Sequence, residues 1–458
     1  MARILTREEQ YEHMTKTPIP RLVTLLAIPT TVNMLVTVIY NTADTYFVSQ
    51  IDKSASAAVG MVYTLMVLIQ ATGYALGVGS GSLISRKLGE KNGDAADLYA
   101  SSAFFAALAV GAVVGWGCLA LLEPLLRLLR CTDTMMPHAI PYAKYILLAA
   151  PISCASFVLS NTLRAEGESR IAMWGLGAGN ILNLALDPLL IFYFGMGAGG
   201  AALATAISQC VSFVALLLIF LAGKSIVRLD IRCVSRSAND YVMIVTNGLP
   251  TLCRQGLGSL ASAVLNIQAV VYGDAAVSAI TIANKVYVFA RSLVIGIGQG
   301  FQPVAGYNYS AGYRRRAWRA FTFSSLVGTV ICLLSAASVA LFAEPLMAWF
   351  SKNGEVVRIG AEMLYFFAAA LPFLAVSTYV NQLYQCLGYR AAATFLASCR
   401  QGIFFLPAVL LLPLRFGCAG VEMSQAVADF ITFLISMPFL VYFYRRHVAD
   451  KNELPSKV

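Results

Sequence analysis

Long apolar runs separated by short polar linkers are the main pattern along this chain. Most runs hold 20 or more residues with few charges, which is the length that an α-helix needs to cross a bilayer. The pattern predicts an all-α membrane protein with twelve transmembrane helices. The expected helices are residues 21–48, 57–85, 97–122, 138–163, 171–194, 199–222, 241–272, 276–307, 317–343, 357–386, 392–414 and 419–444.

The two halves of the chain repeat one another. Pro29 matches Pro250 and Gly167 matches Gly388, each pair about 220 residues apart. Six spans in each half give both halves the same topology, so we expect two six-helix lobes related by a pseudo-two-fold axis along the membrane normal. The expected parts are an N-terminal segment (1–20), an N-lobe with helices 1–6 (21–222), a linker (223–240), a C-lobe with helices 7–12 (241–444) and a tail (445–458).

Two glycine-rich stretches also repeat, Gly77-Val-Gly-Ser-Gly81 and Gly296-Ile-Gly-Gln-Gly300. Neither follows a strand as a dinucleotide-binding loop does, and the chain has no Walker-type loop. We therefore expect close helix packing or bending at these glycines rather than nucleotide binding.

Composition and charge narrow the class of protein further. Of 458 residues 58% are hydrophobic and 12% are charged, and the charged share is about half that of a soluble protein. Basic residues are concentrated on one side of the predicted spans, and we place both Arg390 and Arg400 on that side. This asymmetry predicts a plasma (inner) membrane protein with both termini in the cytoplasm. We expect the lipid bilayer and small organic substrates as partners, no nucleic acid and a monomeric state.

Acidic side chains inside the apolar runs are the strongest chemical signal. Asn180, Asn183 and Asp187 share one helix face, and Pro188 follows them. Asp44 lies in another run, and no basic residue is near either acid in sequence. Two carboxylates with amide neighbours suit a proton or a small hard cation such as Na⁺. The alternative is that these side chains only join helices by hydrogen bonds.

The second half differs, since it has no acid at the positions equivalent to Asp44 and Asp187. It contains instead basic residues and glutamines, which we treat as candidates for lining a substrate cavity. One interpretation is a neutralised structural network with Asp429, and the other is a cavity biased toward anionic or zwitterionic substrates. The candidates are Lys285, Arg291, Gln299, Gln302, Gln382 and Asp429.

These features resemble the multidrug and toxin extrusion (MATE) transporters, most of all their DinF-like bacterial and archaeal branch. The resemblance rests on Asp44, Asn180-x-x-Asn183-x-x-x-Asp187-Pro188, Asn161-Thr-Leu-Arg164-Ala-Glu166-Gly167 and Gln302-Pro303-Val-Ala-Gly306-Tyr307-Asn308-Tyr309. It implies a V-shaped pair of lobes with a cation site in the N-lobe and a bend of helix 1 at Pro29. The implied cation ligands are Asp44, Asn183, Asp187, Thr205 and a carbonyl such as that of Ala201, with Tyr40, Asn161 and Asn180 nearby.

The resulting hypothesis is a secondary multidrug efflux transporter, not an enzyme, which exchanges H⁺ or Na⁺ for organic substrates by alternating access. No cofactor is expected beyond the transported ion. One alternative is a flippase or exporter of a lipid-linked or anionic metabolite in the same fold superfamily. Another is a membrane receptor that transports nothing.

Overall fold

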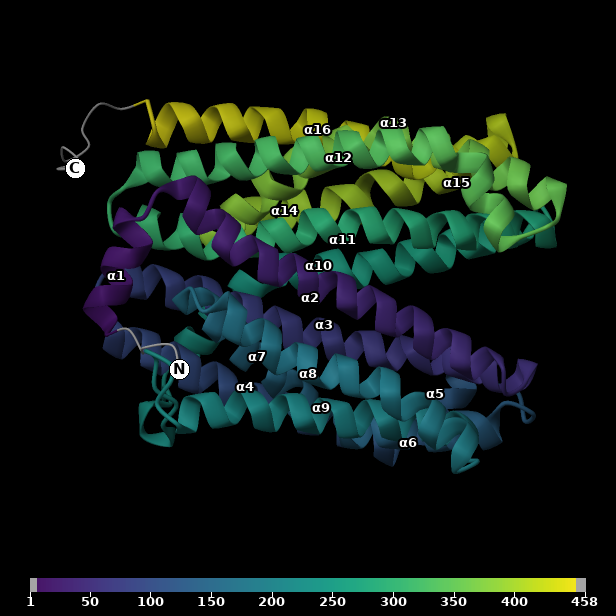
Figure 1. Cartoon of the computed structure of the whole chain (residues 1–458), viewed down its shortest axis with the longest axis horizontal. Helices are drawn as coiled ribbons and strands as arrows, with labels where there is room; N and C mark the ends of the chain where they lie inside the picture. The colour runs from purple at the N-terminus through teal and green to yellow at the C-terminus, as the bar shows by residue number, and fades with distance from the viewer. Residues whose placement is uncertain (1–5, 450–458) are drawn as a thin grey trace. The chain divides into compact units, whose positions relative to one another are not determined.

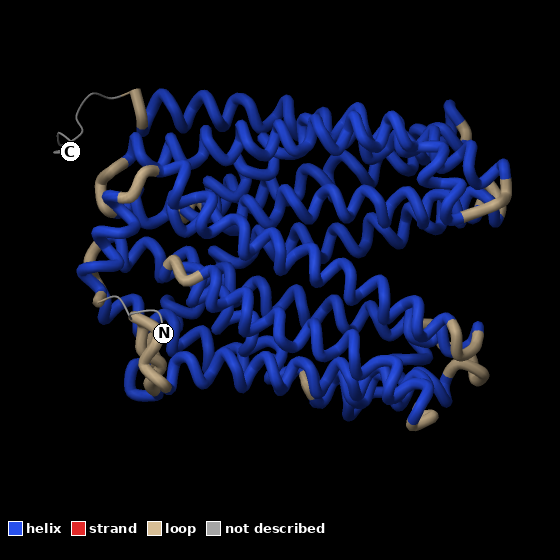
Figure 2. The backbone as a smooth tube through the Cα atoms, in the orientation of Figure 1, coloured by secondary structure: helices blue, strands red, loops and turns tan. Residues whose placement is uncertain are grey.

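The computed structural model describes residues 6–449, and these residues form helices and short connecting loops without any strand (Figure 2). The N-terminal half contains α1 (Arg7–Lys16), α2 (Ile19–Ser49), α3 (Lys53–Gly89), α4 (Gly93–Ala120), α5 (Leu122–Leu128), α6 (Met136–Leu148), α7 (Ala150–Glu166), α8 (Ser169–Pro188), the π-helix η1 (Leu189–Tyr193), α9 (Gly197–Leu221) and the 3₁₀-helix η2 (Ile231–Cys233). The C-terminal half contains α10 (Ala238–Val270), α11 (Asp274–Ser310), α12 (Arg314–Phe350), α13 (Gly354–Cys386), α14 (Arg390–Ser398), the π-helix η3 (Cys399–Phe404), α15 (Phe405–Phe416) and α16 (Cys418–His447).

Ten helical segments among the described residues are long and apolar enough to cross a membrane. The pair α6 and α7, bent by 47°, makes an eleventh span if it is counted as one. The remaining expected span is α10, which has 33 residues and is therefore roughly 50 Å long. The predicted all-α membrane fold is confirmed, with several expected spans divided by bends or π-helical turns.

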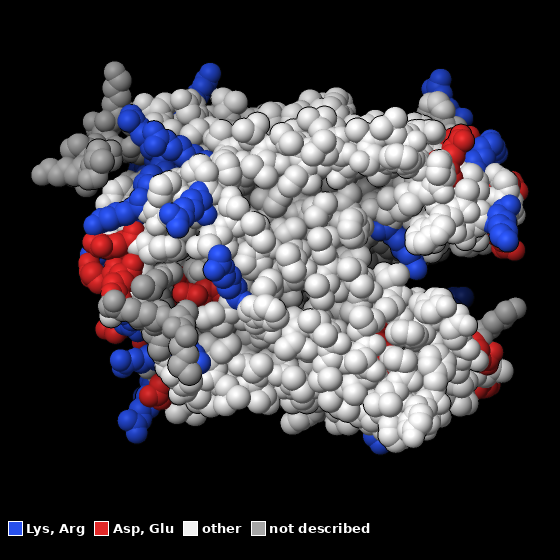
Figure 3. All heavy atoms as spheres, in the orientation of Figure 1, with Lys and Arg blue, Asp and Glu red and all other residues white. Residues whose placement is uncertain are grey.

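The described charged side chains gather at the ends of the helices in each unit of the protein (Figure 3). On the face shown, the band between these ends is almost free of Lys, Arg, Asp and Glu. An uncharged band of this kind fits the hydrocarbon interior of a bilayer. Residues 1–5 and 450–458 lie outside the described residues. The prediction that both termini lie in the cytoplasm concerns these residues and stays a prediction.

The chain forms two compact units, and the first helix of each repeat contributes to both of them. Unit 1 comprises Met1–Lys16 and Val32–Leu252, while unit 2 comprises Thr17–Thr31 and Cys253–Val458. The chain therefore passes from one unit to the other within α2, and again within α10 (Figure 1). The predicted lobes, 21–222 and 241–444, differ from the units in these two helix segments because packing and not chain order defines a unit.

The two glycine-rich stretches pack against these crossing helices. In unit 1, Gly79 of α3 lies against the backbone of Ile244 and Gly248 of α10. In unit 2, Gly296 and Gly300 of α11 lie against α2, whose Thr30 hydroxyl donates a hydrogen bond of 2.7 Å to the Gly296 carbonyl. A methyl group at any of these glycines would overlap the facing backbone. Close helix packing, predicted from the sequence, is therefore the structural role of both stretches.

Helix ends also repeat between the halves, as the sequence predicts. Gly167 ends α7 with φ 95°, and Gly388 follows α13 with φ 86°. In both places the next residue's N–H bonds to a carbonyl five residues back, Glu168 to Leu163 at 2.8 Å and Tyr389 to Tyr384 at 2.9 Å. This is the Schellman arrangement, in which glycine adopts a left-handed conformation at little cost.

Candidate cation site

Asp44 and Asp187 reach one region of unit 1 from two helices, α2 and α8. Asp187 is fully buried, and Asp44 is partly exposed. One carboxylate oxygen of each, Asp44 Oδ1 and Asp187 Oδ2, is buried without a hydrogen-bond partner. The two side chains are close enough to interact electrostatically. The sequence predicts this pair of acids, and the structure brings them into one neighbourhood.

Asn183 joins Asp187 to α9. Its amide Nδ2 donates to Asp187 Oδ1 at 3.2 Å and to Thr205 Oγ1 at 3.3 Å. Ala201 is fully buried one turn before Thr205 on the same helix. The cluster therefore offers carboxylate, amide, hydroxyl and main-chain oxygens, which are the ligands preferred by hard cations.

Pro188 shapes the end of the helix that carries two of these side chains. It has no N–H to donate, and the chain continues as the π-helix η1 from Leu189 to Tyr193. A π-helical turn of this kind is rare and is often found at functional sites. Asp187 thus lies where regular α-helical hydrogen bonding ends.

In the part of the chain that the structure describes, this pair of acids has no basic side chain as an ion-pair partner. Among the ion pairs of the described residues, none includes Asp44 or Asp187. A charged group at the centre of a bilayer costs about 2.5–3.5 kcal/mol on insertion scales. Burial and mutual repulsion therefore both favour the uptake of a positive ion, either a proton or a metal cation. The described residues contain no group of three or more His, Cys, Asp or Glu that would form a conventional metal site.

Tyr40 and Asn180 extend the cluster. Tyr40 is within electrostatic range of both acids. Asn180 donates to Thr37 Oγ1 at 3.3 Å and so links α8 to α2. The contacts of Asn161, a residue expected near the site, are with other residues: it bonds at 2.7 Å to the Phe157 carbonyl of its own helix, and its amide nitrogen lies against Gly77.

Tyr142 of α6 was not found from the sequence. Its ring is 1% exposed, and its hydroxyl is within electrostatic range of both Asp44 and Asp187. A tyrosine hydroxyl both donates and accepts hydrogen bonds, so it can pair with a carboxyl group in either of its protonation states. No motif or spacing in the sequence distinguishes this tyrosine from the many that anchor helices at a membrane interface.

Pro29, the expected bend of the first helix, lies inside a continuous α2. It stands two residues before Thr31, the last α2 residue that belongs to unit 2. The same helix carries Asp44 after it has entered unit 1. A change in the direction of α2 near Pro29 would therefore act directly on the position of Asp44.

In unit 2, Asp429 forms its ion pair with Arg400 and not with Lys285 or Arg291. Arg400 Nε lies 2.6 Å from Asp429 Oδ1. Arg400, grouped from the sequence with the basic residues of the cytoplasmic side, is instead paired with an acid within unit 2, in η3, about three helical turns after the start of α14 at Arg390. Lys285 is exposed and Arg291 is partly exposed on α11.

The three glutamine candidates of unit 2 have different surroundings. Gln299 and Gln302 are partly exposed on α11. Gln382 of α13 is 1% exposed, and its amide packs against Gly298. In this conformation Gln382 therefore acts as a packing residue between α13 and α11.

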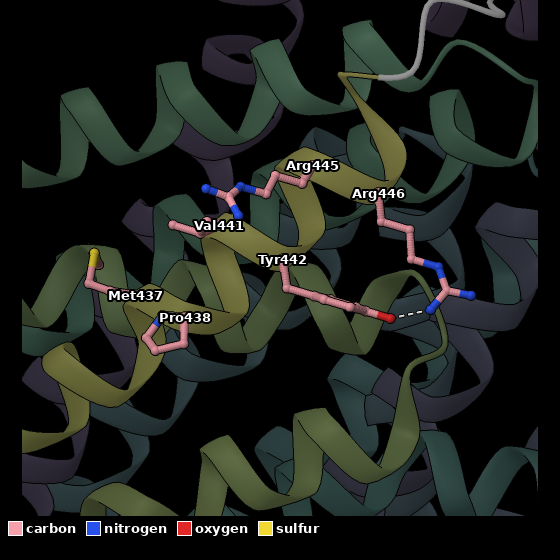
Figure 4. A pocket seen from close by; sticks show the side chains of 6 residues that line it. All are labelled: Met437, Pro438, Val441, Tyr442, Arg445 and Arg446. Carbon is pink, nitrogen blue, oxygen red and sulfur yellow. Dashed lines mark hydrogen bonds between the residues drawn. The ribbon is translucent and has the colours of Figure 1, made fainter.

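A surface hollow of about 810 Å³ lies along α16, remote in sequence from these candidates. It is lined by Met437, Pro438, Val441, Tyr442, Arg445 and Arg446 (Figure 4). Arg446 donates a hydrogen bond to the Tyr442 hydroxyl within it. None of the side chains predicted to bind a cation or a substrate lines this hollow.

Comparison with known proteins gives one consistent result. The MatE family model matches residues 29–189 and again residues 250–410. The multidrug export protein MepA of Staphylococcus aureus (strain N315) is 26% identical over 452 residues, which cover 98% of this chain and 99% of MepA.

Solved structures share the fold. An outward-facing multidrug resistance MATE transporter of the MOP superfamily matches with TM-score 0.89 and 24% identity, over 94% of this chain and 97% of its own. A MOP superfamily transporter of Pyrococcus furiosus, described as having a binding pocket of reverse polarity, matches with TM-score 0.89 and 23% identity, over 95% and 98%. The family match repeats at an interval close to that of the proline and glycine pairs in the sequence.

Proposed function

This chain belongs to the MatE family of multidrug transporters, and we propose that it is a secondary antiporter exporting small organic molecules against an inward flow of H⁺ or Na⁺. The observation that carries the proposal is the pair of unneutralised acids, Asp44 and Asp187, each with a buried oxygen that lacks a hydrogen-bond partner. Structural hydrogen bonding between helices does not require two carboxylates without a base. A site that periodically receives a cation does need such acids, because the incoming ion supplies the positive charge that neutralises them.

In the proposed cycle the ion binds between α2 and α8. Asp44 and Asp187 supply its charge neutralisation, and Asn183, Thr205 and the carbonyl of Ala201 supply further oxygens. Binding removes the repulsion between the two carboxylates, so α2 and α8 are drawn together. Because α2 continues into unit 2 beyond Pro29, this local change is transmitted along one continuous helix. Ion and substrate then each favour a different conformation, which makes their coupling reciprocal.

The protein is a multi-pass membrane protein, and we place it in the plasma membrane with both termini in the cytoplasm. The support is the asymmetric distribution of basic residues between alternate linkers. A single cysteine introduced into the C-terminal tail of a variant without the ten native cysteines, labelled in intact and in permeabilised cells, tests this orientation. Labelling of intact cells by a membrane-impermeant reagent would contradict it.

Transport by purified protein in liposomes tests the antiport proposal. Sodium and proton gradients are imposed separately, and efflux of a panel of dyes is followed. We expect Asp44→Asn and Asp187→Asn each to reduce gradient-driven transport about 100-fold or more, because each removes an acid that the cation neutralises. Asp133→Asn, an exposed acid of the same unit, is the matched control and should transport normally. Normal driven transport by both site variants would refute the role assigned to this pair.

A second candidate function is export or flipping of an anionic or lipid-linked molecule. It is favoured by the basic side chains of unit 2 that have no ion pair, Lys285 and Arg291, among the described residues. For the similar Pyrococcus furiosus transporter, the reverse polarity of the binding pocket is described as suggesting a different function. A fluorescent phosphatidylglycerol in the same liposomes tests this candidate, since only a flippase would speed its movement between leaflets.

A further inference from the structure

Unit 2 contains a buried polar cluster that the cation mechanism does not use. Asp429 accepts hydrogen bonds from Arg400 Nε at 2.6 Å, from Gln425 Nε2 at 2.9 Å and from the Tyr287 hydroxyl at 2.5 Å. Arg400 also bonds to the Tyr287 hydroxyl. The Asp429 side chain has no exposed surface. Its carboxylate is therefore neutralised and fully hydrogen-bonded, so it has no capacity left to receive a cationic substrate.

Arg291 contributes a positive charge near this cluster that is not neutralised by an ion pair with a described residue. It lies one turn after Tyr287 on α11, so both side chains project from the same face of the helix. It is within electrostatic range of both Arg400 and Asp429. The single negative charge of Asp429 already pairs with Arg400, whose Nε lies 2.6 Å from the Asp429 carboxylate. Among the described residues, Arg291 has neither a hydrogen bond nor an ion pair of its own.

The surroundings of Arg291 make this uncompensated charge informative. The residue lies 17 positions into a 37-residue spanning helix, with Ala290 and Ser292 buried on either side. A guanidinium at such a depth is costly unless it has a partner or faces an accessible cavity. The Arg291 side chain is partly exposed, so a ligand can reach it. Asn284, two turns earlier on the same face, is also partly exposed and adds hydrogen-bonding groups.

We propose that Arg291 binds a carboxylate on the exported molecule, so that this transporter accepts zwitterionic and anionic organic substrates. The inference rests on the proposed antiport function and names the substrate class. A guanidinium presents paired N–H donors that match the two oxygens of a carboxylate. The Arg400–Asp429 pair holds Tyr287 in place beside it and keeps Asp429 from neutralising Arg291.

Two dyes that differ by one acidic group give a direct test. Rhodamine 123 is the methyl ester of rhodamine 110, so the first is a cation and the second carries a free carboxylate. Their transport is measured in proteoliposomes holding the full-length protein, with sodium and proton gradients imposed separately. We expect Arg291→Gln to raise the apparent KM for rhodamine 110 about tenfold or more and to leave rhodamine 123 unchanged. Arg291→Lys should restore part of the affinity, because it keeps the charge and loses the paired donors.

The controls separate this inference from the function beneath it. Arg415→Gln, which removes an exposed arginine of the same unit, should change neither dye. Equal losses of both dyes in Arg291→Gln, an unchanged KM for rhodamine 110, or wild-type transport of the ester alone would each overturn the carboxylate site while leaving antiport intact. If neither gradient moves either dye, antiport and the carboxylate site fail together. A fluorescent phosphatidylglycerol whose flipping depends on Arg291, with no effect on rhodamine 110, would overturn the proposal in favour of a lipid headgroup.

Discussion

The polar clusters of units 1 and 2 use corresponding helices and opposite chemistry. In unit 1, α8 carries Asn183 and Asp187, and α9 carries Thr205. In unit 2 the corresponding pair of helices carries Arg400 in η3 and Asp429 in α16. One cluster has two acids without a base, and the other has an acid already paired with one base and a second base nearby. The two repeats thus share the path of the backbone but differ in the charged side chains of their polar clusters. The function of each half therefore has to be argued separately.

Replacing the buried acid of each cluster should break this comparison most clearly. Asp429→Asn leaves Arg400 buried without its counter-ion, so we expect a loss of about 3–5 kcal/mol in the free energy of unfolding. Asp187→Asn removes an unneutralised buried acid, so its stability should stay within about 1 kcal/mol of the wild type. Thermal unfolding of both variants in detergent micelles measures the difference.

The double variant Asp429→Asn with Arg400→Gln is the control for the first of these effects. It removes both charges together and should recover most of the lost stability. Equal stability of Asp187→Asn and Asp429→Asn would contradict the distinction between a neutralised and an unneutralised cluster.

Two glycines of α10 sharpen the comparison at the backbone level. Gly248 packs against Ala75 of unit 1, whereas nothing lies within 4 Å of a methyl group added at Gly256 in the unit 2 part of the same helix. We expect Gly248→Ala to destabilise the protein by about 1–3 kcal/mol through overpacking. Gly256→Ala should stabilise it by roughly 0.5–1 kcal/mol, because alanine favours the helix. The same unfolding assay checks both, and equal shifts would argue against a tight helix contact at Gly248.

The smallest effect concerns two buried threonines. Thr205 accepts a hydrogen bond from Asn183 at 3.3 Å, while the hydroxyl of Thr432 in α16 donates to the Ala428 carbonyl of its own helix at 2.7 Å. Thr205→Val should raise the half-saturating cation concentration for transport about threefold to tenfold, as expected for one hydrogen bond of ~1 kcal/mol. Thr432→Val should leave it unchanged. A matching rise in both variants would assign the effect to general packing.

The sequence predicts the helices and both acids because apolar runs and misplaced carboxylates are local signals. It gives no comparable signal for Tyr142, whose role depends on which helices pack together. The surroundings of Arg400 escape sequence reasoning for a related reason. Its partner, Asp429, lies on α16, so the ion pair depends on how η3 and α16 pack together and not on any local pattern in the sequence. The repeat is visible in Gly167 and Gly388, but the passage of α2 and α10 between units is a matter of tertiary packing.

That passage has a consequence for how this protein can be divided. A chain severed between residues 223 and 237 would yield one fragment that ends before α10 and another that begins just before it. The first fragment would lack the partner for Gly79, and the second would lack the partner for Gly296 and Gly300. Neither fragment contains a complete unit, so expression of either alone should yield misfolded protein. Expressed together from two plasmids, the fragments would complement each other: the first would supply the beginning of α2 to unit 2, and the second would supply the beginning of α10 to unit 1.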